Sequence, residues 1–553
     1  MSFGLSYKVI DKYKITCRLV QPLHIGSSDG AETVLVRSSD NNPFAQASGI
    51  AGALRDYYKH LYPDGLLFGD RKQTEEQDEE ETAEGTAEGT AEGTAEGTAE
   101  GTAEGTAEGT AEGTAEGTAE GTAEGTAEGT AEGTAEGTAE GTAGREKISA
   151  STADSGPASS GESDESGESS RIRVTDGEFL PKTVVLERRP HVRINGKTGT
   201  VSEETTKGTD NKSGQYFARE YIGAGAQLVF YLYTYRESKE DNVPDILREI
   251  LKGLDAGQIR FGGKKSIGCG AVTVEKALYK SFDMTSPDGR KDWAREDQMD
   301  DSNYEKPVDL SSAALKGNTA FRISVTGRTE GSLLVKSITV PEYFADSPDS
   351  VNIQNAKGDY IVPGSSFKGS IRSQMKKIAG YLEKKGQIAS ASSVMAGAFG
   401  REAAADDTGS RGSLFFEDTV VGDRDANDRA EISHRIHIDR FTGGTFEKAL
   451  FTEKDISGDM TFRISILDNT ASAQSCGLLL LALRDLSIGR FSIGSGASVG
   501  KGFIEVDTIE IEDLRKDAEN PQKASIRIKT GEIDDQDELI AGCIKALAEG
   551  GRV

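Results

Sequence analysis

The feature that most constrains this fold is an internal duplication, because six short motifs occur twice along the chain in the same order. One pair opens a predicted amphipathic helix: Ala47–Arg55 reads ASGIAGALR, and Gly364–Arg372 reads GSSFKGSIR. Another pair is rich in glycine, at Arg260–Gly270 and Arg490–Gly502, and each member lies between a predicted helix and a predicted strand. A repeated order of this kind predicts two copies of one structural unit.

A low-complexity insert interrupts the first copy. The tetrapeptide Thr-Ala-Glu-Gly occurs fifteen times in succession within residues 71–170, a segment with 27 acidic and 4 basic residues. The repeats contain no large apolar side chain to offset the entropy of ordering, so we predict a disordered, solvated loop. This segment carries a net charge of −23, which leaves −5 of the total −28 for the other 453 residues. The overall acidity therefore does not exclude a nucleic-acid partner.

The duplication defines the predicted domains. We expect a first domain at 1–280, a polar linker at 281–317, a second domain at 318–510 and a tail at 511–553. Each domain combines alternating strands with a few helices, which is typical of the α+β class with helices on one face of an antiparallel sheet. The tail contains a helical apolar pattern at Asp537–Ala548, which we expect to pack on the second copy.

Several other classes of protein are disfavoured. The four cysteines are scattered without a CxxC pair, and no HExxH motif is present, which argues against a disulfide framework, a zinc site and a His-based metalloenzyme. The longest apolar run, Cys476–Leu483, has eight residues, and the first residues lack the apolar centre of a signal peptide. We therefore expect a cytoplasmic protein with no membrane partner.

The glycine-rich segments are candidate sites for RNA phosphates. Successive backbone N–H groups of such segments can form a concave anion site, and basic residues lie inside both copies: Lys264, Lys265 and Lys501. The second segment lacks the Gly-Lys-Ser/Thr ending of a nucleotide-binding loop and leads into a strand, so ATP binding is rejected. The alternative is a tight turn between a helix and a strand.

Further basic and polar residues extend the candidate RNA surface. The predicted helix N-terminus of the second copy offers free N–H groups beside polar and cationic side chains, although simple capping with solvated cations is the alternative. The first copy has Ala51 where the second has Lys368, which predicts a weaker site there. His24, at a strand end, is either an RNA contact or a histidine with a structural role. The other candidates are Arg55, Arg193, Ser365, Ser366, Lys368, Arg372, Arg435, His437 and Arg440.

Taken in order, these motifs resemble a known family. The sequences LHIG, PGSSFKGSIR, FG, HIDRFTGG and the final glycine-rich loop are similar to those of the RAMP superfamily of CRISPR systems. They look most like the repeated backbone subunit of type III (Csm/Cmr-type) effector complexes, here with two copies fused. The resemblance implies RRM-like, modified ferredoxin-like domains, a thumb-like hairpin and a groove for guide RNA.

The resemblance also implies catalytic residues. In related subunits a loop aspartate cuts the paired target RNA with a divalent metal, and Asp349 lies fourteen residues before Pro363, in the family's placement. Asp346 is the near alternative, and Glu32 occupies the equivalent stretch of the first copy. One carboxylate can suffice because RNA supplies its own 2′-OH nucleophile. A lone loop aspartate is also a common turn cap.

These observations leave four hypotheses. The first is a guide-RNA-binding backbone subunit of an antiviral effector that cleaves complementary target RNA, with Mg²⁺ as the expected metal. Its partners would be guide RNA, target RNA and other type III subunits, including the large polymerase-like subunit. The second is a non-catalytic guide-RNA scaffold, and the third is a ribonuclease that processes guide precursors. The fourth is an acidic protein-interaction module that uses the Glu-rich insert.

Overall fold

The computed structural model describes residues 7–26, 34–69, 169–195, 203–205, 212–214, 216–305, 307–337, 348–402, 409–422 and 430–549. The predicted disordered insert, 71–170, lies outside them except for its last two residues. The description below concerns the unit formed by the chain on either side of that insert.

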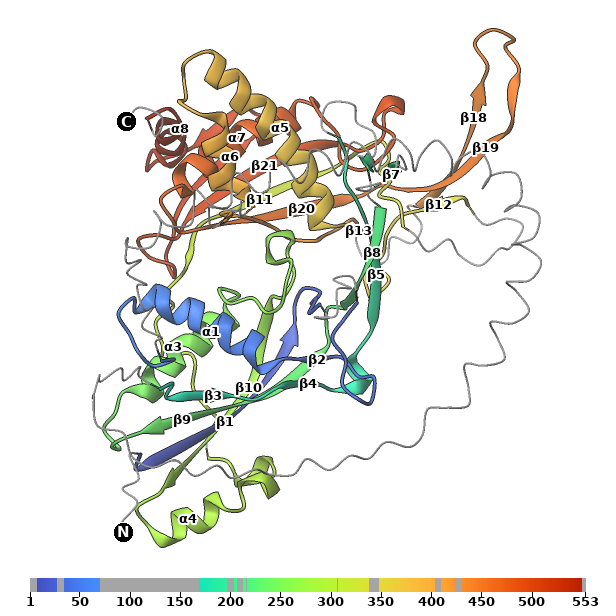
Figure 1. Cartoon of the computed structure of the whole chain (residues 1–553). Helices are drawn as coiled ribbons and strands as arrows, with labels where there is room; N and C mark the ends of the chain where they lie inside the picture. Colours follow the sequence, from blue (N-terminus) through green and yellow to red (C-terminus); the bar gives the residue numbers. More distant parts are fainter. Residues whose placement is uncertain are drawn as a thin grey trace, which may run out of the picture. The chain divides into compact units, whose positions relative to one another are not determined.

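The first copy is built on an antiparallel sheet with the strand order β10-β1-β9-β4-β2, and β3 also pairs with β9 (Figure 1). The strands are β1 (Val9–Leu19), β2 (Phe44–Ala45), β3 (Ile172–Val174), β4 (Gly177–Phe179), β9 (Gln227–Arg236) and β10 (Val272–Asp283). Helix α1 (Ala47–Leu61) lies between β1 and β4 in the chain, and α3 (Val243–Asp255) lies between β9 and β10. Counting β1, β4, β9 and β10 as the four main strands, this is a β-α-β-β-α-β unit.

The second copy repeats that topology. Its sheet has the order β16-β20-β11-β21-β22-β23, from the strands β11 (Thr319–Glu330), β16 (Leu414–Phe416), β20 (Asp459–Leu467), β21 (Phe503–Asp513), β22 (Gln522–Arg527) and β23 (Glu532–Asp534). Its helices are α5 (Gly364–Lys384), α6 (Ala391–Phe399), α7 (Ser472–Ser487) and α8 (Leu539–Glu549). In both copies the main strands lie in the spatial order fourth, first, third, second, so the structure confirms two tandem α+β units.

Alternation along the first strand of each copy explains why the helices share one face. In β1 the side chains of Tyr13, Ile15, Cys17 and Leu19 are buried in one core with α1 and α3. In β11, Phe321, Ile323 and Val325 are buried with α5 and α7 in the same way. A period of two places these residues on one side of each sheet. The predicted packing of helices on one face of an antiparallel sheet is therefore observed.

Two-stranded hairpins extend from both copies. They are formed by β5 (Leu186–Val192) with β8 (Tyr216–Ile222), and by β18 (Ala430–Ile438) with β19 (Thr445–Ile456). Smaller pairings join β6 (Glu203–Thr205) to β7 (Lys212–Gly214), β12 (Ser350–Val351) to β19, β13 (Ile361–Val362) to β17 (Thr419–Val420), and β14 (Gly400–Arg401) to β15 (Ser410–Arg411). Short 3-10 turns lie at Pro181–Thr183, Lys265–Ile267, Glu296–Gln298, Asp301–Asn303 and Ala497–Val499.

The predicted linker, 281–317, contains ordered structure that packs on the first copy. Helix α4 (Pro287–Trp293) places the Trp293 ring 5.8 Å from Tyr233 and 5.3 Å from Phe282, between ring centroids. Lys12 of β1 forms an ion pair with Glu296. Because Lys12 and Tyr13 are successive strand residues, this segment covers the sheet face opposite to the helices.

The predicted tail, 511–553, continues the second copy. Strands β22 and β23 widen its sheet, and α8 packs on α7 with Leu539, Cys543 and Leu547 buried. A Cβ atom on Gly477 of α7 would lie 2.3 Å from the Cys543 carbonyl oxygen, so glycine permits the close approach of the two helices. Within the described part of the chain, none of the helices is long and apolar enough to cross a membrane.

Candidate functional site

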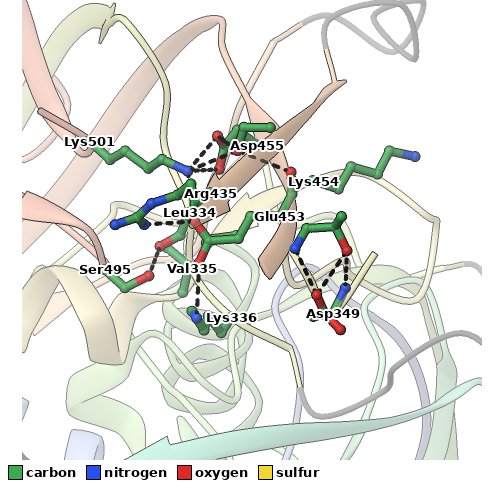
Figure 2. Close-up of polar contacts among 12 residues, drawn as sticks. Leu334, Val335, Lys336, Asp349, Arg435, Glu453, Lys454, Asp455, Ser495 and Lys501 are labelled. Atoms are coloured by element: carbon green, nitrogen blue, oxygen red, sulfur yellow. Dashed lines mark hydrogen bonds and ion pairs between the residues drawn. The ribbon is translucent and has the colours of Figure 1, made fainter. Parts of the chain in front are cut away.

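Asp349 lies at the base of the β18–β19 hairpin, directly before β12. Strand β12 runs parallel to β19, with Ser350 opposite Glu453, and this pairing brings Asp349 to Thr452. The Asp349 carboxylate accepts hydrogen bonds from the Thr452 backbone N–H (2.7 Å) and hydroxyl (2.9 Å). In return, the Asp349 N–H donates to the Thr452 hydroxyl oxygen (3.0 Å). The site is thus an exposed carboxylate whose position is set by one neighbouring residue (Figure 2).

Those hydrogen bonds also set the charge of Asp349. The Thr452 backbone N–H and then its hydroxyl lower the pKa of the Asp349 carboxyl below its ordinary value, and Lys336 adds a smaller effect in the same direction. Hydrogen bonds to the charged form of a carboxylate favour ionisation. Asp349 is therefore an ionised carboxylate at neutral pH and a weak proton acceptor.

A buried charge cluster lies beside Asp349, on the opposite face of β19 from Thr452. Glu453 accepts hydrogen bonds from Lys336 (3.2 Å), Arg435 (3.0 Å) and Lys501 (2.9 Å), as Figure 2 shows. Burial alone would raise the pKa of Glu453, but hydrogen bonds from Lys501, Arg435 and Lys336 outweigh it and lower the pKa to about 2. Lys501 also donates to both carboxylate oxygens of Asp455, at 2.6 and 2.7 Å. The cluster ties the glycine-rich loop to the hairpin.

This geometry gives Lys501 and Arg435 carboxylate partners within the protein, and their predicted phosphate contacts stay a prediction. Lys501 is only 7% exposed, and its ammonium group is engaged by two carboxylates and the Ser433 hydroxyl. Arg435 is half-buried against Glu453. Further along the hairpin, His437 and Arg440 are exposed, and their RNA contacts stay a prediction.

The glycine-rich loops have the same backbone geometry in both copies. Gly270 and Gly502 have φ values of +86° and +81°, and an added Cβ would lie 2.0 and 2.1 Å from a carbonyl oxygen of the same loop. Their N–H groups donate to the loop that follows the first strand of the respective copy, at Pro22 and Ser332. These N–H groups are therefore used in closing the turn, as the structural alternative for the loops requires. Lys264 is exposed, at a φ of +58°.

The N-terminus of α5 meets the first copy's glycine-rich loop. The Gly364 N–H donates to Asp418 (2.9 Å), so one helix-end group is already satisfied. Lys368 donates to the Ser266 hydroxyl (2.8 Å), and its ammonium lies 5.9 Å from the centre of the Phe399 ring. Burial and then the charge of Arg372 lower the pKa of Lys368 to about 8.

The predicted residues from both copies therefore lie near one another at this junction. Ser365 and Ser366 are half-buried in the first turn of α5, and Arg372 is exposed one turn beyond Lys368. The adjoining Lys265 is half-buried, and burial lowers its pKa. The sequence alone does not bring the first copy's glycine-rich loop and the N-terminus of α5 together, because about a hundred residues separate them in the chain.

The remaining predicted residues have separate positions. His24 is 3% exposed, its Nδ1 lies 2.7 Å from the Glu220 carbonyl oxygen, and its ring packs near Tyr221, which favours the structural alternative. Arg55 is exposed and donates to the Gly69 carbonyl oxygen (3.3 Å). Arg193, in the first copy, is exposed. Glu32 and Asp346 lie outside the described residues.

Sequence reasoning missed several residues of this site. Thr452, Glu453 and Asp455 carry no motif, although a strand that reads Thr-Glu-Lys-Asp is unusually polar. Asp418 was also missed: it caps α5 and receives Arg189 of the first copy at 2.5 Å. Arg189 is buried between Asp418 and Glu187, so this contact is a structural ion pair between the two copies.

Comparison with known proteins places these features in a family. The family model of the RAMP superfamily matches residues 16–273 and 344–505, which is more than half of the chain and falls in both copies. None of the curated proteins matches this sequence significantly.

Proposed function

This chain belongs to the RAMP superfamily, and on that premise we propose that it is a fused double backbone subunit of a type III CRISPR effector complex. In this proposal the two RRM-like domains bind guide RNA, and the second copy cleaves the complementary target RNA. The partners are guide RNA, target RNA and the other effector subunits, including the large polymerase-like subunit. Superfamily membership is compatible with a CRISPR-associated RNA-binding role.

The observation that carries the catalytic proposal is the position of Asp349. It is an exposed, ionised carboxylate at the base of a hairpin, and Thr452 holds it with three hydrogen bonds. A lowered pKa makes it a poor general base but a good oxygen ligand. Its proposed role is therefore to orient the reacting nucleotide and to fix the geometry of the displacement. The 2′-hydroxyl gives its proton to water as its oxygen bonds to phosphorus, and the bond between phosphorus and the 5′-oxygen breaks, with that oxygen taking a proton from water.

The expected divalent metal fits this donor only in part. Among the described residues, no group of three or more His, Cys, Asp or Glu side chains could hold a metal ion. Mg²⁺ commonly takes one or two carboxylates and fills its other positions with phosphate oxygens and water, so Asp349 could supply the protein ligand. When bound, the cation would stabilise negative charge on the phosphate.

The alternative is a guide-RNA scaffold without nuclease activity, and the same hydrogen bonds favour it. An aspartate that accepts a backbone N–H and a threonine hydroxyl is also a stable turn cap. The two functions differ only in whether Asp349 acts on the target RNA.

The test is cleavage of a labelled RNA complementary to the guide, in the assembled complex with Mg²⁺. Wild type is compared with Asp349→Ala, with Asp349→Asn, which keeps a hydrogen-bond acceptor for Thr452, and with Glu32→Ala. The proposal expects both Asp349 variants to lose one cut by about a hundredfold or more while guide RNA is retained. Equal cutting by all four proteins would show that neither Asp349 nor Glu32 is the nuclease residue, so that the chain is a scaffold or its nuclease residue lies elsewhere.

A further inference from the structure

The chain segment that enters the second copy is bound on the helices of the first. The Tyr57 hydroxyl of α1 donates to the Lys316 carbonyl oxygen, and the Lys316 ammonium forms an ion pair with Glu249 of α3 at 2.9 Å. The side-chain oxygen of Gln258, just after α3, accepts the backbone N–H two residues beyond Lys316, at 3.1 Å. The stretch Lys316–Thr319 is thus held beside α1 and α3 immediately before and at the start of β11.

The duplication identifies the equivalent place on the second copy. The helix motifs align Arg55 with Arg372, and the glycine-rich loops align Gly270 with Gly502, whose N–H groups make the same contact in each copy. With these alignments, the residues that hold Lys316–Thr319 in the first copy have direct counterparts in the second. His60 of α1 belongs to this set, because its Nε2 lies 3.3 Å from the Gly317 carbonyl oxygen. The first-copy residues Tyr57, His60, Glu249 and Gln258 correspond to Gln374, Lys377, Leu481 and Arg490.

All four counterparts line one groove of about 1130 Å³ on the second copy. The groove lies between residues of α5, α7 and α8, and the turn Gly386–Ile388 also lines it. In the first copy the corresponding surface binds the segment that leads into a neighbouring sheet. The groove is the equivalent surface of the second copy. Among the described residues, no segment of this chain binds there as Lys316–Thr319 binds to the first copy.

The lining of the groove differs from the first-copy site in charge. Leu481 replaces Glu249, so the acidic partner of Lys316 has an apolar counterpart in the groove. The charged lining residues are Lys377, Lys385, Arg484, Arg490 and Asp485, a net charge of +3. Asp485 is buried and accepts hydrogen bonds from Gln374 (2.6 Å) and Arg484 (2.9 Å). Arg490 Nε also lies 4.0 Å from the Asp485 carboxylate, and the side chains of Arg484 and Arg490 are 59% and 64% exposed.

Apolar side chains complete the groove. Ile378 and Leu382 of α5, Leu481 of α7 and Ile544 of α8 are partly buried, and Tyr381 is 60% exposed at the edge. A groove with an apolar floor and a cationic rim fits a polypeptide that combines apolar and acidic side chains.

We propose that this groove binds a segment of a neighbouring protein subunit, namely the segment that leads into that subunit's first strand. The segment carries an acidic side chain at the position equivalent to Lys316. The inference rests on the proposed function, in which the chain has protein neighbours in an assembled particle. The neighbour's backbone takes the place of Lys316–Thr319, and its carboxylate meets Lys377 and Arg490.

The first experiment reverses the charge of the groove. Particles are assembled with guide RNA and the other subunits, using wild type, the double variant Lys377→Glu/Arg490→Glu, or Lys384→Glu, an exposed residue of α5 that does not line the groove. The double variant should bind its neighbour about tenfold or more weakly, and the control should match wild type. Guide RNA bound to the chain is quantified separately and should not change. Full retention of the neighbour by the double variant would overturn the proposal.

A second experiment identifies the occupant directly. A photo-crosslinking amino acid replaces Tyr381, and Ile533, exposed on β23, carries the same group as a control. The proposal expects a crosslink from position 381 to a polypeptide segment that contains an acidic residue and precedes a strand. A crosslink to RNA, or none in an intact particle, would refute it. If even the wild-type chain holds no guide RNA and joins no particle, the proposed function fails and this inference fails with it.

Discussion

The buried ammonium of Lys501 provides the sharpest test of how the hairpin is held. Lys501→Met keeps the length and most of the volume of the side chain but removes its charge. It leaves Glu453 and Asp455, whose side chains are 7% and 6% exposed, without their shared cation. Glu453 keeps Arg435 and Lys336, whereas Asp455 keeps only the Ser433 hydroxyl among the side-chain contacts described.

The size of the effect follows from this burial. Removing one partner of a buried ion pair costs roughly 3–5 kcal/mol, because a desolvated charge remains. Lys336→Met is the matched control, since Lys336 contacts the same Glu453 from a position that is 50% exposed. An exposed pair contributes about 0–1 kcal/mol. The double variant Lys501→Met/Asp455→Asn should recover most of the loss, because it removes the uncompensated charge as well.

The pH dependence has a defined sign. The pKa of Glu453 is about 2 in the folded protein against an ordinary value of 4.5, so Glu453 contributes stability above pH 4.5 that is lost as the pH falls through 2. Without Lys501 the effect of burial is offset less, and the pKa rises. The difference between wild type and Lys501→Met should therefore be largest at neutral pH and should shrink below pH 4.5.

The assay is urea unfolding followed by circular dichroism at several pH values, with hydrogen–deuterium exchange to locate the opening. Exchange should accelerate in β18 and β19 more than in the first copy. Equal losses for Lys501→Met and Lys336→Met, or a difference that does not depend on pH, would refute the reasoning.

Three other predictions follow from particular contacts. Thr452→Val should slow target cleavage about tenfold or more and move the acid limb of the pH–rate profile to higher pH, because Asp349 loses a hydroxyl donor that lowers its pKa. Thr452→Ser should restore both the rate and the profile, and failure of that rescue would count against a positioning role. The affinity for guide RNA, measured by filter binding, should fall as the pH rises through 8, where Lys368 loses its proton, and Lys368→Arg should abolish this dependence. The stability of the free protein should instead increase between pH 8 and 10.5, because the unfolded chain holds that proton more tightly. Gly502→Ala should lower the melting temperature more than Gly500→Ala, because both have positive φ but only at Gly502 would a Cβ meet a carbonyl oxygen, at 2.1 Å; equal shifts in a thermal melt would contradict this.

Local signals predicted the secondary structure well. The helix expected to open at Gly364 begins there, and the helix expected to end at Ala548 ends one residue later, at Glu549. Such signals are short in range: a proline before a helix, apolar residues at helical spacing, and alternation along a strand. The duplication predicted that both copies share one topology, whereas the modified ferredoxin-like topology itself was implied by the family resemblance.

The chemistry of the candidate residues required the tertiary structure. Lys501 and Arg435 are cations in motifs, and from the sequence alone each could face a phosphate or a carboxylate. The structure pairs Lys501 with Asp455, 46 residues away, and Asp349 with Thr452, 103 residues away. The charge on a side chain is visible in the sequence, but its partner depends on which strands pair and in which register.

The sequence by itself determined that this chain is two copies of one α+β unit with a charged insert. The signals for this are local: apolar periodicity, glycine and proline at the ends of helices and strands, and repeated motifs. Only the tertiary structure decided that Lys501 and His24 are buried, that Asp349 is exposed and held by Thr452, and that the second copy carries a groove where the first binds the entering segment. Burial and pairing are properties of how distant segments pack, and they set which charges remain available for a partner.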